Sequence, residues 1–332
     1  MTARCQLGSI WLEGLTGGVG HVNSQSLLNL CLGHPNLTYL DMDLRYFSSV
    51  LHLHHFLLYF CKLSSLRLEH TLSSDPGLEL HFDAGTHRTH SHHSLSVAFL
   101  CFAHMSADCA SQILRLVGVG MPFKVPTHLE ISLVDRPSAD HLRSVASSLK
   151  QCGSHLKRFE WYNEKGNDLD AVPCTTANTS LLTLDVILGL TPSRHILQGF
   201  LLEVLSNVAS PQLRWLRIDV TLLHPTAFRS RSEDSFTTVD AQDLTRAFRD
   251  VLSRSVFTQA TDLSIQIEVR GNNAPLSDGI QSDMVNLFTP WLDRGFVQID
   301  FYELSLKIYS ERITQLFVTM PLQFVLHANH TE

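Results

Sequence analysis

The segment that decides the fold is Leu213-Arg-Trp-Leu216-Arg-Ile218-Asp-Val220, because its spacing of apolar residues returns along the chain. Related segments carry apolar residues at the first, fourth and sixth positions, and they begin at residues 37, 63, 126, 156, 181, 260 and 296. Alternation of apolar and polar residues over such a length is typical of a β-strand with one buried face. We therefore expect a short strand in each of these eight segments.

The spacing of the segments indicates a repeat. Measured between their fourth positions, the steps are 26, 63, 30, 25, 32, 47 and 36 residues. The 63-residue step is about twice the others, which predicts a further, degenerate strand near residues 95–102. Nine units would then average about 32 residues each, slightly more than the about 20–29 residues of a leucine-rich repeat. That excess is expected if every unit carries a full helix.

The segments between the strands have the spacing of amphipathic helices. The clearest case is Ser138–Lys150, where apolar residues recur at helical spacing, Ser138 is a suitable N-cap and Gly153 is a stop signal. The same pattern predicts helices at residues 24–32, 51–60, 107–117, 194–208, 240–252, 279–292 and 310–320.

Strands that alternate with helices are joined by crossovers and are therefore parallel. This predicts an α/β fold, specifically an irregular leucine-rich-repeat-like βα solenoid with parallel strands on the concave face and helices on the convex face. Residues 1–23 would form an N-terminal cap or remnant, and residues 24–332 the solenoid of about nine irregular repeats. A doubly wound α/β sheet is the alternative, but its strands need no shared Leu-x-x-Leu-x-Leu offset.

Composition narrows the class of protein. Of the 332 residues, 44% are hydrophobic, which excludes intrinsic disorder. The 25 basic and 32 acidic residues give a net charge of −7, which argues against a general nucleic-acid binder. The seven cysteines are scattered and odd in number, and no apolar run is long enough for a membrane span. We expect an intracellular protein, cytoplasmic or nuclear, with reduced thiols and no membrane contact.

The polar positions of the predicted strands form a candidate binding surface. Of 24 such positions, nine are acidic and three are basic. An acidic surface attracts basic protein segments and repels phosphate, and aromatic residues supply interface anchors. The predicted protein-binding residues are Asp41, Asp43, Arg67, Glu130, Glu160, Tyr162, Asp185, Trp215, Asp219, Asp300 and Tyr302.

Two loops offer chemistry of a different class. His81–His93 contains five histidines that could bind a metal, and Gly14–Gly20 superficially resembles a phosphate-binding loop. The histidine loop lacks ligands at fixed spacing that would complete a site, and the glycine loop lacks the Gly-Lys-Ser/Thr ending. We expect no catalytic residues, no metal and no cofactor. The alternative is a metal- or nucleotide-dependent enzyme that uses one of these loops.

Residues 24–44, SQSLLNLCLGHPNLTYLDMDL, resemble the leucine-rich-repeat regions of fungal F-box proteins, and residues 210–218 and 292–299 read similarly. The resemblance implies a non-enzymatic scaffold whose repeats select a protein for ubiquitination, as a substrate-receptor-like component of a cullin-RING ubiquitin ligase. In that family an N-terminal F-box recruits the Skp-type adaptor. The resemblance covers the repeat region only, and the F-box itself is not found in the 23 residues before it. We therefore do not expect this chain alone to bind the adaptor.

Overall fold

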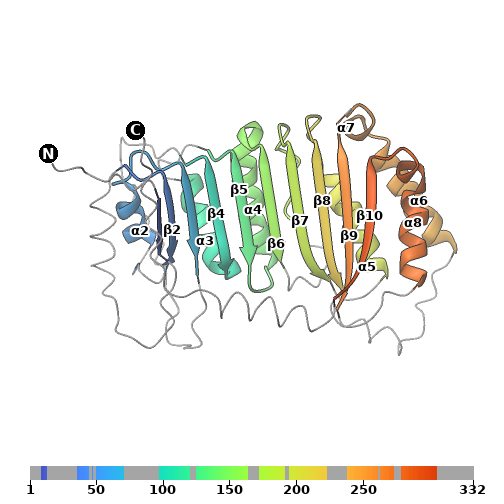
Figure 1. Ribbon diagram of the computed structural model, residues 1–332, viewed down its shortest axis with the longest axis horizontal. Helices are drawn as coiled ribbons and strands as arrows, with labels where there is room; N and C mark the ends of the chain where they lie inside the picture. Colours follow the sequence, from blue (N-terminus) through green and yellow to red (C-terminus); the bar gives the residue numbers. More distant parts are fainter. Residues whose placement is uncertain are drawn as a thin grey trace, which may run out of the picture. The chain divides into compact units, whose positions relative to one another are not determined.

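The structure is a computed structural model (Figure 1), and the chain divides into two compact units. Unit 1 comprises Met1–Val134 and Gln323–Glu332, and unit 2 comprises Asp135–Leu322. The structure describes residues 9–12, 36–44, 47, 50–70, 97–119, 125–163, 172–190, 194–222, 238–260, 262–272 and 278–304. The helices expected at residues 24–32 and 310–320 lie outside these ranges.

The described part of unit 1 is a parallel sheet with two helices. Its elements are β1 (Ser9–Leu12), β2 (Tyr39–Asp43), α2 (Val50–Leu57), β3 (Ser65–Glu69), β4 (Phe99–Met105), α3 (Ala107–Val119) and β5 (His128–Leu133). The strands pair in chain order, each parallel to the next. β4 is the strand that the 63-residue step predicted, and Figure 1 shows α3 behind these strands.

Unit 2 repeats this arrangement with longer helices. Its elements are α4 (Ala139–Cys152), a 3-10 turn (Gly153–His155), β6 (Arg158–Asn163), β7 (Thr183–Leu190), α5 (Arg194–Asn207), β8 (Trp215–Leu222), α6 (Thr238–Leu252), α7 (Ser255–Thr258), β9 (Ser264–Asn272), α8 (Asp278–Leu292) and β10 (Val297–Leu304). β6 to β10 are also parallel neighbours in chain order. Figure 1 shows α5 behind the strands, so the opposite strand face carries no described helix. The expected α/β fold with a parallel sheet is confirmed.

The apolar positions of the repeated segments form the core. Ile299 is half-buried, whereas at the other seven fourth positions the exposed fraction is between 0 and 6%; these residues are Leu40, Leu66, Leu129, Phe159, Leu184, Leu216 and Leu263. This confirms the predicted inward face. The helices add their own apolar residues, and α5 contributes Phe200 and Leu205, both fully buried. Burial of this surface from water is the main driving force for folding of both units.

Relative to β8, β9 and β10 are each displaced by two residues from the expected alignment, in opposite directions, so their alignment with each other differs by four residues. Leu216 of β8 is opposite Ile265 of β9, and Ile265 is opposite Val297 of β10, whereas the repeat pattern had aligned Leu263 and Ile299. The pattern was ambiguous because side chains alternate with a period of two, so a shift of two residues keeps every side chain on the same face. Backbone hydrogen bonds to the neighbouring strands decide the alignment.

Helix α4 begins and ends where the sequence predicted. The Ser138 hydroxyl accepts a hydrogen bond from the His141 backbone N–H at 3.4 Å, and His141 Nδ1 accepts one from the Ser138 N–H at 3.1 Å. This reciprocal pair is a capping box in which histidine takes the usual place of Glu or Gln. Gly153 follows the helix with φ of 49°, a conformation that favours glycine.

Side chains from later elements satisfy the carbonyls at helix ends in unit 2. Asn178, which is fully buried, donates from Nδ2 to the Leu149 carbonyl at 2.8 Å and to the Gly153 carbonyl at 3.0 Å. Arg254 donates to the Ser206 and Val208 carbonyls, each at 2.8 Å. These bonds connect the segment before β7 to the end of α4, and the residue before α7 to the end of α5.

The described cysteines are unpaired thiols, and three of the five are buried: Cys101, Cys109 and Cys152. Burial disfavours the thiolate, and it raises the pKa of Cys109 to about 12 and that of Cys152 to about 11. Among the described helices, none combines the length and the apolar character that a membrane crossing requires.

Candidate functional site

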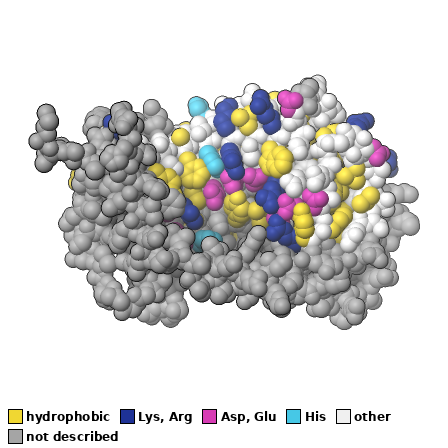
Figure 2. Space-filling view, viewed as in Figure 1, with side chains coloured by type: hydrophobic (Ala, Val, Ile, Leu, Met, Phe, Trp, Pro, Cys, Tyr) yellow, Lys and Arg dark blue, Asp and Glu magenta, His cyan; other side chains and the backbone are white. Residues whose placement is uncertain are grey.

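The strand face of unit 2 that points away from the helices gathers most of the charged candidates. We define the outward face of unit 2 by five carboxylates, three guanidinium groups and two aromatic rings. They are Glu160, Asp185, Asp219, Glu268, Asp300, Arg158, Arg217, Arg270, Trp215 and Tyr302. In Figure 2, acidic and basic side chains lie together over the strands, with hydrophobic side chains among them. Parallel pairing in register puts them in rows across β6 to β10.

Two arginines and two carboxylates form a network on β8 and β9. Arg217 Nη2 lies 3.0 Å from Glu268 Oε1 and 3.5 Å from Asp219 Oδ2. Arg270 Nη2 lies 2.6 Å from both Asp219 Oδ2 and Glu268 Oε2. The two positive and two negative charges cancel. The network therefore contributes no net charge to the face.

The pKa of Glu268 reflects its contacts with the two arginines. Burial favours the neutral carboxylic acid, but hydrogen bonds from Arg270 and Arg217 outweigh it and hold the pKa of Glu268 below its ordinary value. The pKa of Arg217 is raised although burial opposes its charge, because Glu268 and Asp219 stabilise the guanidinium. Glu268 and Arg217 are therefore both ionised at neutral pH.

A second cluster, on β6 and β7, contains two carboxylates and one guanidinium group. Glu160 and Asp185 are opposite each other in the register and share Arg158, whose Nε lies 2.7 Å from Glu160 Oε1 and whose Nη2 lies 3.6 Å from Asp185 Oδ2. Burial and the neighbouring Glu160 raise the pKa of Asp185, despite Arg158, Arg217 and a hydrogen bond from Trp215. Asp185 Oδ1 is buried and has no hydrogen-bond partner among the described residues. The cluster itself therefore holds two carboxylates and one guanidinium, and Arg217, opposite Asp185 in the register, is shared with Asp219 and Glu268.

Asp300 on β10 is the second place with surplus charge. Its carboxylate accepts hydrogen bonds from the neutral Gln298 amide at 2.9 and 3.1 Å and from the Gln266 amide at 3.5 Å. Within the described residues, no Lys or Arg lies within ion-pair distance of it. Asp300 is half-buried, whereas Tyr302, two residues further along the strand, is exposed and has the Arg270 guanidinium 5.9 Å from its ring centre.

The arginines cover the paired carboxylates. Side chains of Arg158 and Arg217 are 48 and 33% exposed, whereas those of Glu160 and Asp219 are 7 and 4% exposed. Most of the predicted acidic residues are therefore held beneath guanidinium groups. The most accessible groups on the face are the arginines, Asp300 and the rings of Trp215 and Tyr302, which are 38 and 45% exposed, while the Glu160 and Asp185 side chains retain 7 and 10%.

The remaining predicted residue of unit 2, Tyr162, donates a hydrogen bond from its hydroxyl to Glu160 Oε2. This bond and the ion pair with Arg158 hold Glu160 in place. Tyr162 therefore belongs to the supporting structure of the β6–β7 cluster.

Unit 1 has a smaller group of the same type. Arg67 Nη1 lies 3.7 Å from Asp41 Oδ2, which also accepts a hydrogen bond from the Tyr39 hydroxyl at 3.3 Å. Burial and the Asp41 charge raise the pKa of Tyr39 to about 12. The other two predicted residues of unit 1 are Asp43, which is buried, and Glu130, which is half-buried. The structure thus brings Asp41 and Arg67 together within this unit.

Glu268, Arg270, Gln266 and Gln298 belong to the face, although the sequence did not select them as site residues. The two-residue shift in the alignment of β9 explains the omission of Glu268 and Arg270, because it ended the expected strand before them. The signal was present: Glu268 follows Ile267 as Asp219 follows Ile218. Extending the alternation by two residues on each late strand would have found it.

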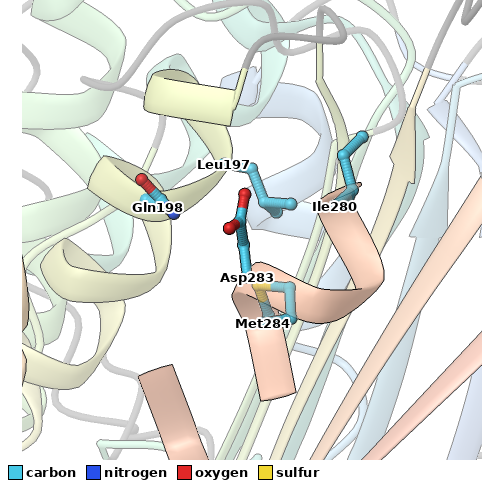
Figure 3. Close-up of a pocket in the computed structure, with 5 residues that line it drawn as sticks. All are labelled: Leu197, Gln198, Ile280, Asp283 and Met284. Atoms are coloured by element: carbon cyan, nitrogen blue, oxygen red, sulfur yellow. The ribbon is translucent and has the colours of Figure 1, made fainter. Parts of the chain in front are cut away.

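The two loops with possible enzymatic chemistry, His81–His93 and Gly14–Gly20, lie outside the described residues. A small recess is present instead between α5 and α8, lined by Leu197, Gln198, Ile280, Asp283 and Met284 (Figure 3). Its lining is largely apolar. It lies between helices and shares no residue with the outward face.

Comparison of the chain with protein-family models, curated proteins and solved structures finds no match.

Proposed function

We propose that this protein is a non-enzymatic interaction module that binds a basic, extended segment of a partner protein on the outward face of unit 2. The observation that carries this proposal is the location of the surplus charge. Five carboxylates face three guanidinium groups, and the excess lies at the Glu160–Asp185 pair and at Asp300. A cation from a partner would compensate both places.

The aromatic residues support a protein as the partner. Trp and Tyr are enriched among the residues that dominate binding energy at protein interfaces. Trp215 and Tyr302 are the exposed aromatic side chains of this face; Tyr302 lies beside Arg270, which ion pairs orient, and Trp215 donates a hydrogen bond to Asp185. Such preorganised side chains lose little conformational entropy on binding.

The strand order within each unit supports the finer architecture, so we propose a leucine-rich-repeat-like βα solenoid with the described strands lining its concave face. Neither unit shows, among its described strands, the reversal of strand order that marks a doubly wound sheet. We also propose an intracellular location, supported by the unpaired described thiols. The role as substrate receptor of a cullin-RING ubiquitin ligase rests on the resemblance of the repeat segments.

Selection of peptides from a random displayed library against the full chain tests the proposal. We expect the selected peptides to be rich in Lys and Arg, and to bind a Trp215→Ala, Asp300→Lys double variant at least about tenfold more weakly. The matched control changes an exposed apolar residue and an exposed aspartate of α8 and the turn after it, Val285→Ala and Asp293→Lys. Selected peptides that are acidic, or that bind both double variants as tightly as the original chain, would overturn the proposal.

A further inference from the structure

The two places with surplus charge on the outward face of unit 2 have a defined separation. Asp185 is on β7 and Asp300 is on β10, which are three strand spacings apart in the order β7-β8-β9-β10. Neighbouring strands lie about 4.8 Å apart, so the two carboxylates are separated by about 14 Å across the strands. The register aligns Asp185 with Gln298. Asp300 is two residues beyond Gln298, which places it about 7 Å further along the strand direction.

In an extended peptide, two residues at a fixed spacing in the sequence are separated by the same distance. The peptide advances about 3.4 Å per residue, and alternate side chains point to the same side. Residues four apart therefore lie about 14 Å apart and face the same surface. The long, flexible side chain of lysine covers the remaining offset along the strands.

The centre of this path is positively charged at its surface. Arg217 on β8 and Arg270 on β9 lie between the two places, and their side chains are 33 and 27% exposed. A basic residue midway along the partner segment would meet these guanidinium groups. A neutral or acidic residue there avoids the repulsion.

Asp185 provides an independent reason to expect a bound cation at one end. Only 7% of this residue is exposed, and its Oδ1 atom accepts no hydrogen bond from the described residues. A buried acceptor without a donor is costly, and a cationic side chain placed against the Glu160–Asp185 pair would add to the compensation from Arg158 and from Arg217, which is shared with Asp219 and Glu268.

We infer that the partner segment carries two basic residues separated by three residues, with a non-basic residue midway, so that one cation lies at the Glu160–Asp185 pair and the other at Asp300. This inference rests on the proposed function and specifies the partner of the same face. The proposed function requires only a basic segment, whereas this inference also specifies the spacing of its basic residues.

The test measures fluorescence anisotropy of labelled nine-residue Gly/Ser peptides with the full chain. One peptide has lysines at positions i and i+4, a second has the same two lysines adjacent, and a third adds a lysine at i+2 to the first. We expect the i, i+4 peptide to bind about fivefold more tightly than the adjacent one, near the upper end for one exposed ion pair. We also expect the third peptide to bind more weakly than the first despite its additional charge.

Two variants of the chain locate the effect. Asp300→Asn keeps the shape and the amide contacts of the side chain, and it should remove the advantage of the i, i+4 peptide. Asp293→Asn removes an exposed carboxylate beside α8 and should leave that advantage unchanged. Thermal unfolding of each variant checks that it folds. The comparison of the three peptides uses the original chain, so it remains valid even if a variant does not fold.

The outcomes separate the two proposals. Equal binding of all lysine peptides, or tighter binding of the three-lysine peptide, would overturn the spacing rule and leave the proposed function intact. Failure of every basic peptide to bind, with peptides from the displayed library binding elsewhere, would overturn the proposed function itself.

Discussion

Asp185 and Glu268 have similar exposed fractions, 7 and 6%, yet their pKa values move in opposite directions. Glu268 accepts hydrogen bonds from two arginines, whereas Asp185 shares Arg158, at 3.6 Å, with Glu160 and shares Arg217 with Asp219 and Glu268. Burial alone therefore does not decide the ionisation of these groups. The number and distance of the arginines around each carboxylate decide it.

The Asp185→Asn variant should be more stable than the original chain, and this difference in the free energy of unfolding should grow as the pH increases. The native pKa of Asp185 lies above 3.8, its ordinary value, so ionisation costs native stability as the pH rises through the raised value. Below pH 3.8 the acid is protonated in both states and this cost is absent. Urea unfolding at a series of pH values measures the effect. A difference between variant and original chain that stays constant with pH would contradict it.

Glu268→Gln should have the opposite pH dependence. The native pKa lies below 4.5, so the stabilising effect of the carboxylate is present above pH 4.5 and is lost as the pH falls through the lowered native value. We expect a loss of about 1–3 kcal/mol in the free energy of unfolding at pH 7, because two arginines lose a charged acceptor. The same urea series should show the loss disappearing in acid. Equal stability of the two chains at pH 7 would show that the network is not coupled to folding.

At the scale of elements, the helices and strands are connected by a few buried polar side chains. Asn178 lies before β7 and donates to carbonyls at the end of α4 and in the following turn, and the Ser210 hydroxyl before β8 donates to the Leu181 carbonyl at 2.7 Å. These bonds fix the distance between each helix end and the next strand. The apolar core supplies the driving force, and these bonds supply the geometry.

Asn178→Ala should destabilise unit 2 by about 1–3 kcal/mol, because it removes two hydrogen bonds: the Gly153 carbonyl loses the Asn178 amide, and the Leu149 carbonyl keeps only the Gly153 N–H as donor. Thr179→Ala is the matched control, since the neighbouring side chain is exposed and should change stability by less than about 0.5 kcal/mol. Chemical denaturation monitored by circular dichroism gives both values. Similar losses for the two variants would show that the Asn178 bonds do not stabilise the fold.

At the scale of the whole molecule, the net charge of −7 and the two surplus carboxylates of the outward face act in the same direction on a basic partner. We expect the association rate with the i, i+4 lysine peptide to fall as ionic strength rises from about 0.05 to 0.3 M, because salt screens exposed charges. Asp300→Lys should flatten this dependence more than Asp293→Lys, since only Asp300 lies on the face. Stopped-flow mixing measures the rates. A salt dependence that is unchanged in both variants would place binding away from the outward face.

The sequence by itself determined the alternation of strands and helices, the inward position of residues such as Leu216, and the limits of α4 at Ser138 and Gly153. These features depend on local periodicity and capping, which operate within a few residues. The tertiary structure alone decided the alignment of β9 and β10 and, with it, the pairing of Arg270 with Asp219. The reason is that a shift of two residues leaves every side chain on its face but changes which charge is opposite which. It also decided that most carboxylates of the outward face lie beneath arginines, because ion pairs between strands form only once the register is set.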